Sequence, residues 1–131
     1  MNTFLDGMFE QSSLPVLEAA MKYAGRRHAV IANNIANWNT PGYRAVDIPL
    51  ADFQKTLRET VESGRSGSVS RVNLQAREPD EAVIMRHDGN TVDITREMTR
   101  MGENALFYNV AIQLAKTKYS MLKDAIRGRV G

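Results

Sequence analysis

The chain has 131 residues, a length that one domain accounts for, and no cysteine, which excludes disulfides and thiol chemistry. Its formal net charge of +2 is far below the basic excess of typical nucleic-acid-binding proteins, and no apolar run is long enough for a membrane-spanning helix. Hydrophobic residues make up 43% of the chain but aromatic residues only 7%, which favours helical packing over a dense globule.

The first twelve residues lack the basic and apolar regions of a secretory signal peptide, so composition alone suggests a cytoplasmic protein. They carry a small apolar cluster instead. Two interpretations are open: a frayed terminus with a hydrophobic anchor, or a segment that an export or assembly partner recognises. The residues of this possible export segment are Phe4, Leu5, Met8 and Phe9.

A first long helix is predicted from about Leu14 to Asn37, with Ser12 or Ser13 as its cap. Its apolar residues alternate at spacings of three and four, the pattern of a heptad seam that packs against another helix. Only His28 breaks the apolar character, and we expect it to be a packed residue rather than a ligand or a catalytic base. The seam consists of Leu14, Leu17, Met21, Ala24, His28, Ile31, Ile35 and Trp38.

The end of this helix is rich in asparagine and is followed by a Pro-Gly pair. Asparagine tolerates helix ends, and its amide can bond to carbonyls that the helix leaves free. Proline at the second position and glycine at the third predict a type II turn, which ends the helix and reverses the chain. The residues of this motif are Asn33, Asn34, Asn37, Asn39, Thr40, Pro41, Gly42 and Tyr43.

The middle of the chain reads as one short helix between irregular segments. We expect extended chain over 43–49, a helix over 50–62, a flexible linker over 63–68 and a loop or edge strand over 69–79. Residues 82–92 resemble a short hairpin around Asp88-Gly89. The apolar side of the short helix consists of Leu50, Phe53, Leu57 and Val61.

The longest predicted element is a last helix from about Asp93, a plausible N-cap, to Ile126 or Arg127. It carries an unbroken seam, which we expect to pair with the first helix: Ile94, Met98, Met101, Ala105, Tyr108, Ile112, Ala115, Tyr119, Leu122 and Ile126. A second stripe lies roughly 130° around the helix. A two-helix pair would leave it in water, so we expect other copies or related chains to cover it, with residues 50–92 folding back over it as the alternative. The second stripe is Phe107, Leu114 and Met121.

These elements predict a mainly α protein of one domain, residues 1–131, in which the two long terminal helices pair as an antiparallel coiled coil. Residues 14–38 and 93–127 would form a shaft. Residues 39–92, with the short helix and the small irregular or hairpin segment, would connect the helices and cover the outside. This arrangement is typical of a subunit that polymerises through its helices.

The motif over residues 32–43 resembles the N-terminal signature of bacterial flagellar rod and hook proteins. Two further stretches resemble the basal-body rod proteins, and most of all the B-type proximal rod subunits: residues 43–48 followed by Phe53, and residues 88–93 leading into Glu97 and residues 103–108. The short length and the lack of a large central domain also favour the rod proteins. The C-type proximal rod protein or another flagellar axial subunit is the alternative.

The resemblance implies a structural subunit that polymerises helically into the proximal drive shaft and transmits torque through the periplasm. It implies export through the flagellar type III apparatus without a cleaved signal, and so a place in the basal body rather than the cytoplasm. The implied partners are itself and other rod subunits, the ring–rod junction protein, and the export apparatus and membrane ring. No cofactor, metal, nucleic acid or small-molecule substrate is implied.

Two other classes of function find little support in the residues. If the chain were an enzyme, His28 and His87 would be its only imidazole bases. The spacing of the carboxylates Asp47, Asp52 and Glu59 is not typical of a catalytic pair. A small basic helical binding module would use the arginines of the middle segment. These are interleaved with acids and lack stacking aromatic residues: Arg58, Arg65, Arg71, Arg77 and Arg86.

Overall fold

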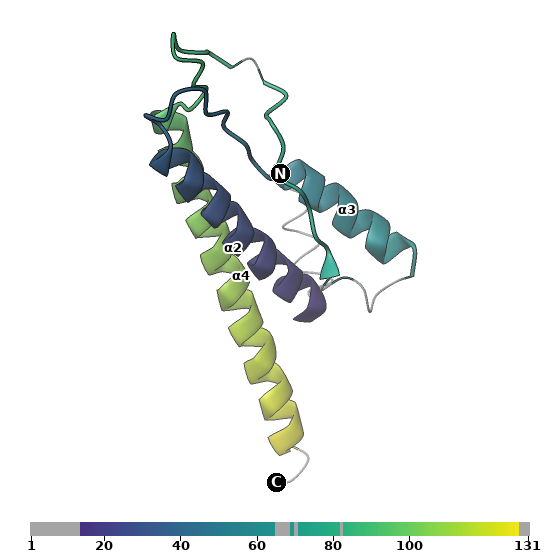
Figure 1. Cartoon of the computed structure of the whole chain (residues 1–131). Coiled ribbons are helices and arrows are strands. Elements are labelled where there is room, and N and C mark those ends of the chain that lie inside the picture. The colour runs from purple at the N-terminus through teal and green to yellow at the C-terminus, as the bar shows by residue number, and fades with distance from the viewer. Residues whose placement is uncertain (1–13, 65–68, 70, 82, 129–131) are drawn as a thin grey trace.

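The computed structural model describes residues 14–64, 69, 71–81 and 83–128. They contain three helices: α2 (Leu14–Ala36), α3 (Leu50–Glu62) and α4 (Ile94–Gly128). The two long helices lie side by side, and α3 packs on the opposite side of α2 from α4 (Figure 1). The chain is therefore mainly α, as predicted, and the helix boundaries agree with those expected from the sequence to within two residues.

The helices α2 and α4 run antiparallel. Near the end of α2, the amide of Asn34 contacts Glu97 at the start of α4, and farther back along α2 the carbonyl of Ala24 accepts a hydrogen bond from Asn104. Small residues are buried on both helices, which permits a short distance between their axes. The buried alanines are Ala19, Ala20, Ala24, Ala111 and Ala115.

The face of α4 that α2 covers is not the predicted seam. At 100° per residue, three of its four buried residues, Glu97, Asn104 and Ala111, lie between the two predicted stripes, and only Ala115 belongs to the seam. Most of the seam points away from α2, and Met98 and Tyr119 are 59% and 64% exposed. The expectation that this seam pairs with α2 is therefore wrong for α4, because small and polar residues make the contact and apolar periodicity cannot detect them.

Only part of the second stripe is covered within the chain. Phe107 and Leu114 pack against the main hydrophobic cluster, where Phe107 meets Tyr23 of α2, whereas Met121 is 60% exposed. The reason is visible in Figure 1, where α4 continues well beyond the first turn of α2. Its last ten residues, 119–128, are all exposed.

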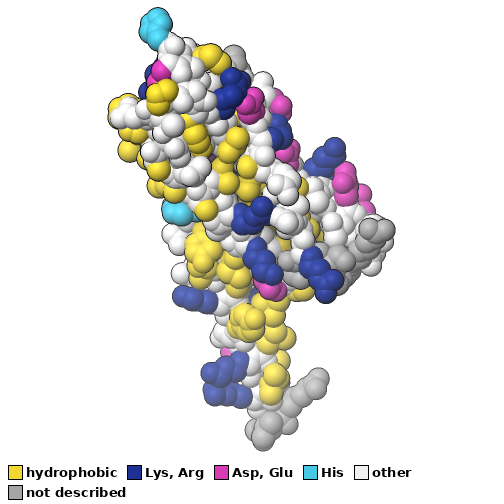
Figure 2. Space-filling model, viewed as in Figure 1, with side chains coloured by type: hydrophobic (Ala, Val, Ile, Leu, Met, Phe, Trp, Pro, Cys, Tyr) yellow, Lys and Arg dark blue, Asp and Glu magenta, His cyan; other side chains and the backbone are white. Residues whose placement is uncertain are grey.

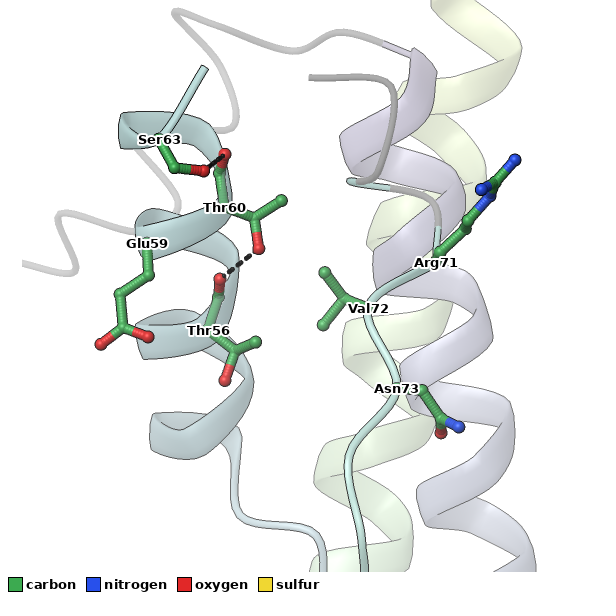
Figure 3. A pocket seen from close by; sticks show the side chains of 7 residues that line it. All are labelled: Thr56, Glu59, Thr60, Ser63, Arg71, Val72 and Asn73. Atoms are coloured by element: carbon green, nitrogen blue, oxygen red, sulfur yellow. Dashed lines mark hydrogen bonds between the residues drawn. The ribbon is translucent and has the colours of Figure 1, made fainter. Parts of the chain in front are cut away.

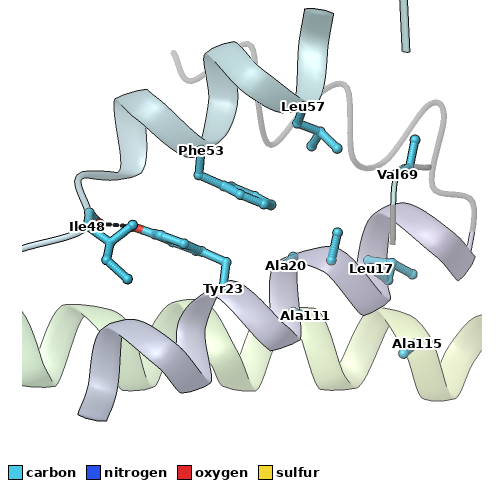
Figure 4. Close-up of a cluster of buried hydrophobic side chains, with 10 residues drawn as sticks. Leu17, Ala20, Tyr23, Ile48, Phe53, Leu57, Val69, Ala111 and Ala115 are labelled. Carbon is cyan, nitrogen blue, oxygen red and sulfur yellow. Dashed lines mark hydrogen bonds between the residues drawn. The ribbon is translucent and has the colours of Figure 1, made fainter. Parts of the chain in front are cut away.

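The core lies between α2, α3 and one side of α4, and Tyr23 is at its centre (Figure 4). The ring of Tyr23 stacks on Phe53 of α3, with centroids 4.5 Å apart, and meets Phe107 of α4 edge-on at 5.9 Å. Its hydroxyl donates a 2.7 Å hydrogen bond to the carbonyl oxygen of Ile48, and burial raises the pKa of this tyrosine. One aromatic residue thus joins all three helices.

Two further expectations about single elements are wrong. His28 is exposed rather than packed, because the inward face of α2 near its end is formed by Arg27, Ile31 and Asn34. The Asp88-Gly89 turn does form, with Gly89 at φ +80° and its N–H bonded to the carbonyl of Arg86. However, none of the described residues in 82–92 forms a strand, so the turn is not the tip of a hairpin. Ser12, Ser13 and residues 65–68 lie outside the described residues.

Candidate functional site

The two sequence motifs, residues 32–43 and residues 88–93, meet at one end of the helix pair. There the end of α2, the turn that follows it and the approach to α4 are joined by hydrogen bonds, and we call this the junction. It is the best-defined polar arrangement in the described part of the chain. No helix there is long and apolar enough to cross a membrane, and no three of its His, Asp or Glu residues lie where they could hold a metal ion.

The turn after α2 has the predicted type. Gly42 adopts φ +74°, and the N–H of Tyr43 bonds to the carbonyl of Thr40 at 3.2 Å. Asn37 caps its own helix, as expected of this asparagine, because its amide donates to the carbonyl of Asn33 at 2.8 Å. The hydroxyl of Thr40 in turn donates to the Asn37 amide oxygen at 3.0 Å. The helix end is therefore closed by its own side chains.

Asn34 is fully buried, and its side chain makes four hydrogen bonds to three residues. Its amide nitrogen donates to the Val46 carbonyl at 2.7 Å and to a carboxylate oxygen of Glu97 at 3.0 Å. Its amide oxygen accepts from the Val46 N–H at 3.2 Å and from the Tyr43 hydroxyl at 2.9 Å. These bonds use every donor and acceptor that an asparagine side chain has. Asn34 thus holds the extended segment after the turn between α2 and α4.

Asn90 performs the same task from the other motif. It is fully buried, and its amide nitrogen donates to the carbonyls of Asn37 and Thr40 at 3.0 and 2.8 Å. Its amide oxygen accepts the N–H of Val92 at 2.7 Å. Carbonyls at the end of a helix have no partner within it, and Asn90 supplies one. The role of Asn90 was not predicted, since the sequence indicated only a turn at this position.

The two turns are also in direct backbone contact. The N–H of Gly42 bonds to the carbonyl of Asp88 at 2.8 Å, and the N–H of Thr91 bonds to the carbonyl of Tyr43 at 3.0 Å. A Cβ atom on Gly89 would stand 3.5 Å from the Cα of Gly42. A Cβ atom on Gly42 would meet no atom within 4 Å, so its positive φ rather than close packing favours glycine there.

Two ion pairs lie next to the junction, one within α4 and one between α2 and the segment that follows the turn. Glu97, 2% exposed, bonds to Arg100 at 3.1 Å as well as to Asn34. Arg27 of α2 forms a two-pronged contact with Asp47, with both nitrogen–oxygen distances at 2.9 Å. Burial, the largest single influence, would lower the pKa of Arg27, but the hydrogen bonds to Asp47 and the nearby groups Tyr23, Asp47 and Glu103 together raise it. Removing one partner of such a pair leaves a buried charge, which is strongly destabilising.

The amino-acid sequence of the chain is similar to those of known proteins. The family model described as flagella basal body rod protein matches residues 14–44, which are α2 and the turn. The flagellar basal body rod protein FlgB of Escherichia coli is 32% identical over 117 residues, which cover 77% of this chain and 83% of that protein. The FlgB proteins of Yersinia enterocolitica and Bacillus subtilis are 34% and 30% identical, over 85% and 86% of this chain and 85% and 91% of their own lengths. The chain belongs to the flagellar basal body rod protein family.

The residues that the family model matches end at residue 44, within the junction. Trp38, the last residue of the seam predicted for the first helix, lies in the turns just after α2. The Arg86 guanidinium lies 5.6 Å from the Trp38 ring centroid and donates a hydrogen bond to the Trp38 carbonyl. Trp38 is 41% exposed, so it forms part of the outer wall of the junction.

Elsewhere, a groove of about 560 Å³ runs between α3 and residues 71–73 (Figure 3). The hydroxyls of Thr60 and Ser63 donate to the carbonyls of Thr56 and Thr60, so both are already used within α3. The arginines of the middle segment are also engaged in part, since Arg77 binds Asp52 and Asp80.

Proposed function

We propose that this chain is a structural subunit of the flagellar basal-body rod, which polymerises helically into the proximal drive shaft and transmits torque. The observation that carries this proposal is the apolar surface that α4 leaves uncovered in a single chain. Side chains of this kind gather along its lower half in Figure 2. The exposed large hydrophobic residues of α4 are Met98, Leu106, Tyr108, Val110, Tyr119, Met121, Leu122 and Ile126.

An exposed apolar surface of this extent indicates a binding surface. It lies on two sides of α4, so contacts through it can join more than two copies. The predicted seam on α4 supports this proposal, because five of its large residues are exposed and available to a neighbouring subunit: Met98, Tyr108, Tyr119, Leu122 and Ile126. Met101 and Ile112 of the same seam are half-buried. The part on α2 belongs mainly to the subunit's own interior: Leu17, Met21, Ile31 and Ile35.

The junction supports the mechanical part of the proposal. A shaft subunit must hold its outer segment at a fixed angle while torque acts on it, and the junction joins that segment to both long helices through buried hydrogen bonds. We propose accordingly that residues 14–38 and 93–127 form the shaft and residues 39–92 the outer segment of a single domain.

The proposal extends to location and partners. We propose that the chain lies in the rod within the periplasmic space and is exported without a cleaved signal peptide, with Phe4, Leu5, Met8 and Phe9 as part of the export segment. Its partners would be itself and other rod subunits, the ring–rod junction protein, and the export apparatus with the membrane ring. The family is one of structural rod components, and we propose no catalytic step.

The test is complementation in a strain from which the gene for this chain has been deleted. The deletion should abolish swimming and leave basal bodies without a rod, and expression of the intact chain should restore both. Electron microscopy of isolated basal bodies separates loss of the rod from loss of rotation. Normal swimming of the deletion strain would contradict the proposal.

A further inference from the structure

A second exposed apolar surface lies at the opposite end of the molecule from the end of α4. Val83, Ile84 and Met85 are consecutive and are 40%, 89% and 53% exposed. Ile84 and Met85 border a hollow of about 680 Å³ that continues to Asp88. Three consecutive exposed apolar residues are unusual on a protein surface unless they bind a partner. We call this surface the tip.

The other surface is the exposed end of α4, residues 116–128, which we call the tail. Figure 1 places the tip beside the start of α4 and the tail at its far end. Glu81, next to the tip, is ion-paired to Arg96, and Tyr119 lies 23 positions farther along the same helix. At 1.5 Å per residue these points are about 35 Å apart, so the tip cannot reach the tail of its own chain.

The two surfaces have complementary charge. Near the tip, residues 78–88 carry four carboxylates and one arginine, whereas residues 116–127 of the tail carry three lysines, one arginine and one aspartate. Glu78, Asp80 and Glu81 contact arginines of their own chain, but these ion pairs are exposed. Exposed pairs contribute little, so these carboxylates can be shared with a second partner.

We propose that the tip of one copy docks on the tail of a second copy, with Ile84 and Met85 against Tyr119, Leu122 and Ile126. This proposal rests on the proposed role as an assembling subunit and names the contact. Because the two surfaces differ, the contact is head-to-tail, and each added copy presents a free tip or tail for the next. Such a contact produces a polymer with a direction.

The absence of cysteine permits a direct test by disulfide cross-linking. Two chains, one with Ile84→Cys and the other with Leu122→Cys, are expressed together in the deletion strain and oxidised in the cell. A mixed disulfide should form, and a chain carrying both substitutions should give a ladder longer than the dimer. Lys55→Cys, at an exposed position on α3, replaces Ile84→Cys in the control and should give no product.

A charge reversal adds a second measurement. Lys123→Glu in the tail chain should reduce the yield of mixed disulfide by about fivefold, and Asp80→Lys in the tip chain should restore it. A mixed yield no higher than the Lys55→Cys control would overturn the head-to-tail contact, as would cross-linking of Leu122→Cys only to itself or to a protein of another mass. If the strain swims only with the gene and no mixed disulfide forms, the contact fails and the rod function stands. If the strain swims without the gene, the rod function fails.

Discussion

Asn34 and Glu97 lie 63 positions apart in the sequence, and the amide of the first donates a 3.0 Å hydrogen bond to the carboxylate of the second. This bond joins the end of α2 to the start of α4 inside the junction. Replacing Asn34 with alanine would leave the carboxylate and the Val46 backbone groups without this partner. We expect Asn34→Ala to lower the free energy of unfolding by roughly 2–4 kcal/mol.

Urea denaturation followed by far-UV circular dichroism measures this loss. Asn39→Ala, at an exposed position in the same motif, is the matched control and should change stability by less than about 0.5 kcal/mol. Equal effects of the two substitutions would show that the network of Asn34 contributes no more than the surface does.

Gly42 provides a test of the turn. Its φ of +74° is unfavourable for a β-branched residue, so Gly42→Val should cost roughly 1–3 kcal/mol and reduce swimming in the complementation assay. Gly25→Ala is the control, because Gly25 is inside α2 and a Cβ there would meet no atom within 4 Å. This control should gain up to about 1 kcal/mol from helix propensity. A neutral Gly42→Val would exclude strain at this turn.

Tyr23 should make the fold sensitive to alkali. Burial raises its pKa above the ordinary value of about 10, so the stability that its neutral hydroxyl contributes is complete below pH 10 and is lost as the pH rises further. Tyr23→Phe should lose about 1 kcal/mol at neutral pH with the hydrogen bond to Ile48 and should then decline less steeply between pH 9.5 and 11. Tyr119→Phe, at an exposed position, should keep the original slope.

Asp52 should make the stability of the fold depend on pH in the acid range. Its hydrogen bond from Arg77 lowers the pKa of the carboxyl, so its contribution is present at neutral pH and is lost as the pH falls below about 4. The carboxyl is about one-third exposed, which limits the effect to less than about 1 kcal/mol. Asp52→Asn should therefore slightly lower the free energy of unfolding at pH 7 but not at pH 2.5. The control, Asp124→Asn on the tail, should leave the free energy of unfolding unchanged at both pH values.

The second stripe separates folding from assembly. Leu114 packs on the core, so Leu114→Glu should lower the free energy of unfolding by several kcal/mol because it places a charge there. Met121 is 60% exposed, so Met121→Glu should leave the isolated chain as stable as before but abolish rod formation and swimming. Wild-type swimming with Met121→Glu would remove this position from the assembly surface.

The elements themselves could be predicted because their signals are local. Apolar periodicity gave the helices, Pro41-Gly42 gave the turn, and Asp93 caps α4 as expected, with its carboxylate accepting the N–H of Arg96 at 3.2 Å. The face of α4 that meets α2 could not be predicted, because Glu97 and Asn104 become interior residues only through partners on another helix. The roles of Asn90 and Arg27 in the candidate site could not be predicted for the same reason. Their hydrogen-bond partners come from other parts of the chain, so the sequence around each residue does not indicate its role.

The positions of Asn34 and Glu97 also set an order of events. The junction closes only when both residues are present, and the chain between them includes all of α3 and the outer segment. A chain delivered through a narrow channel therefore cannot lock its two long helices together until more than 60 residues have passed. Up to that point α2 lacks its packing against α4, and in proteins most of the stability of a helix comes from such packing. The network that joins the two long helices therefore closes only after most of the chain has been delivered, which would suit the export proposed above.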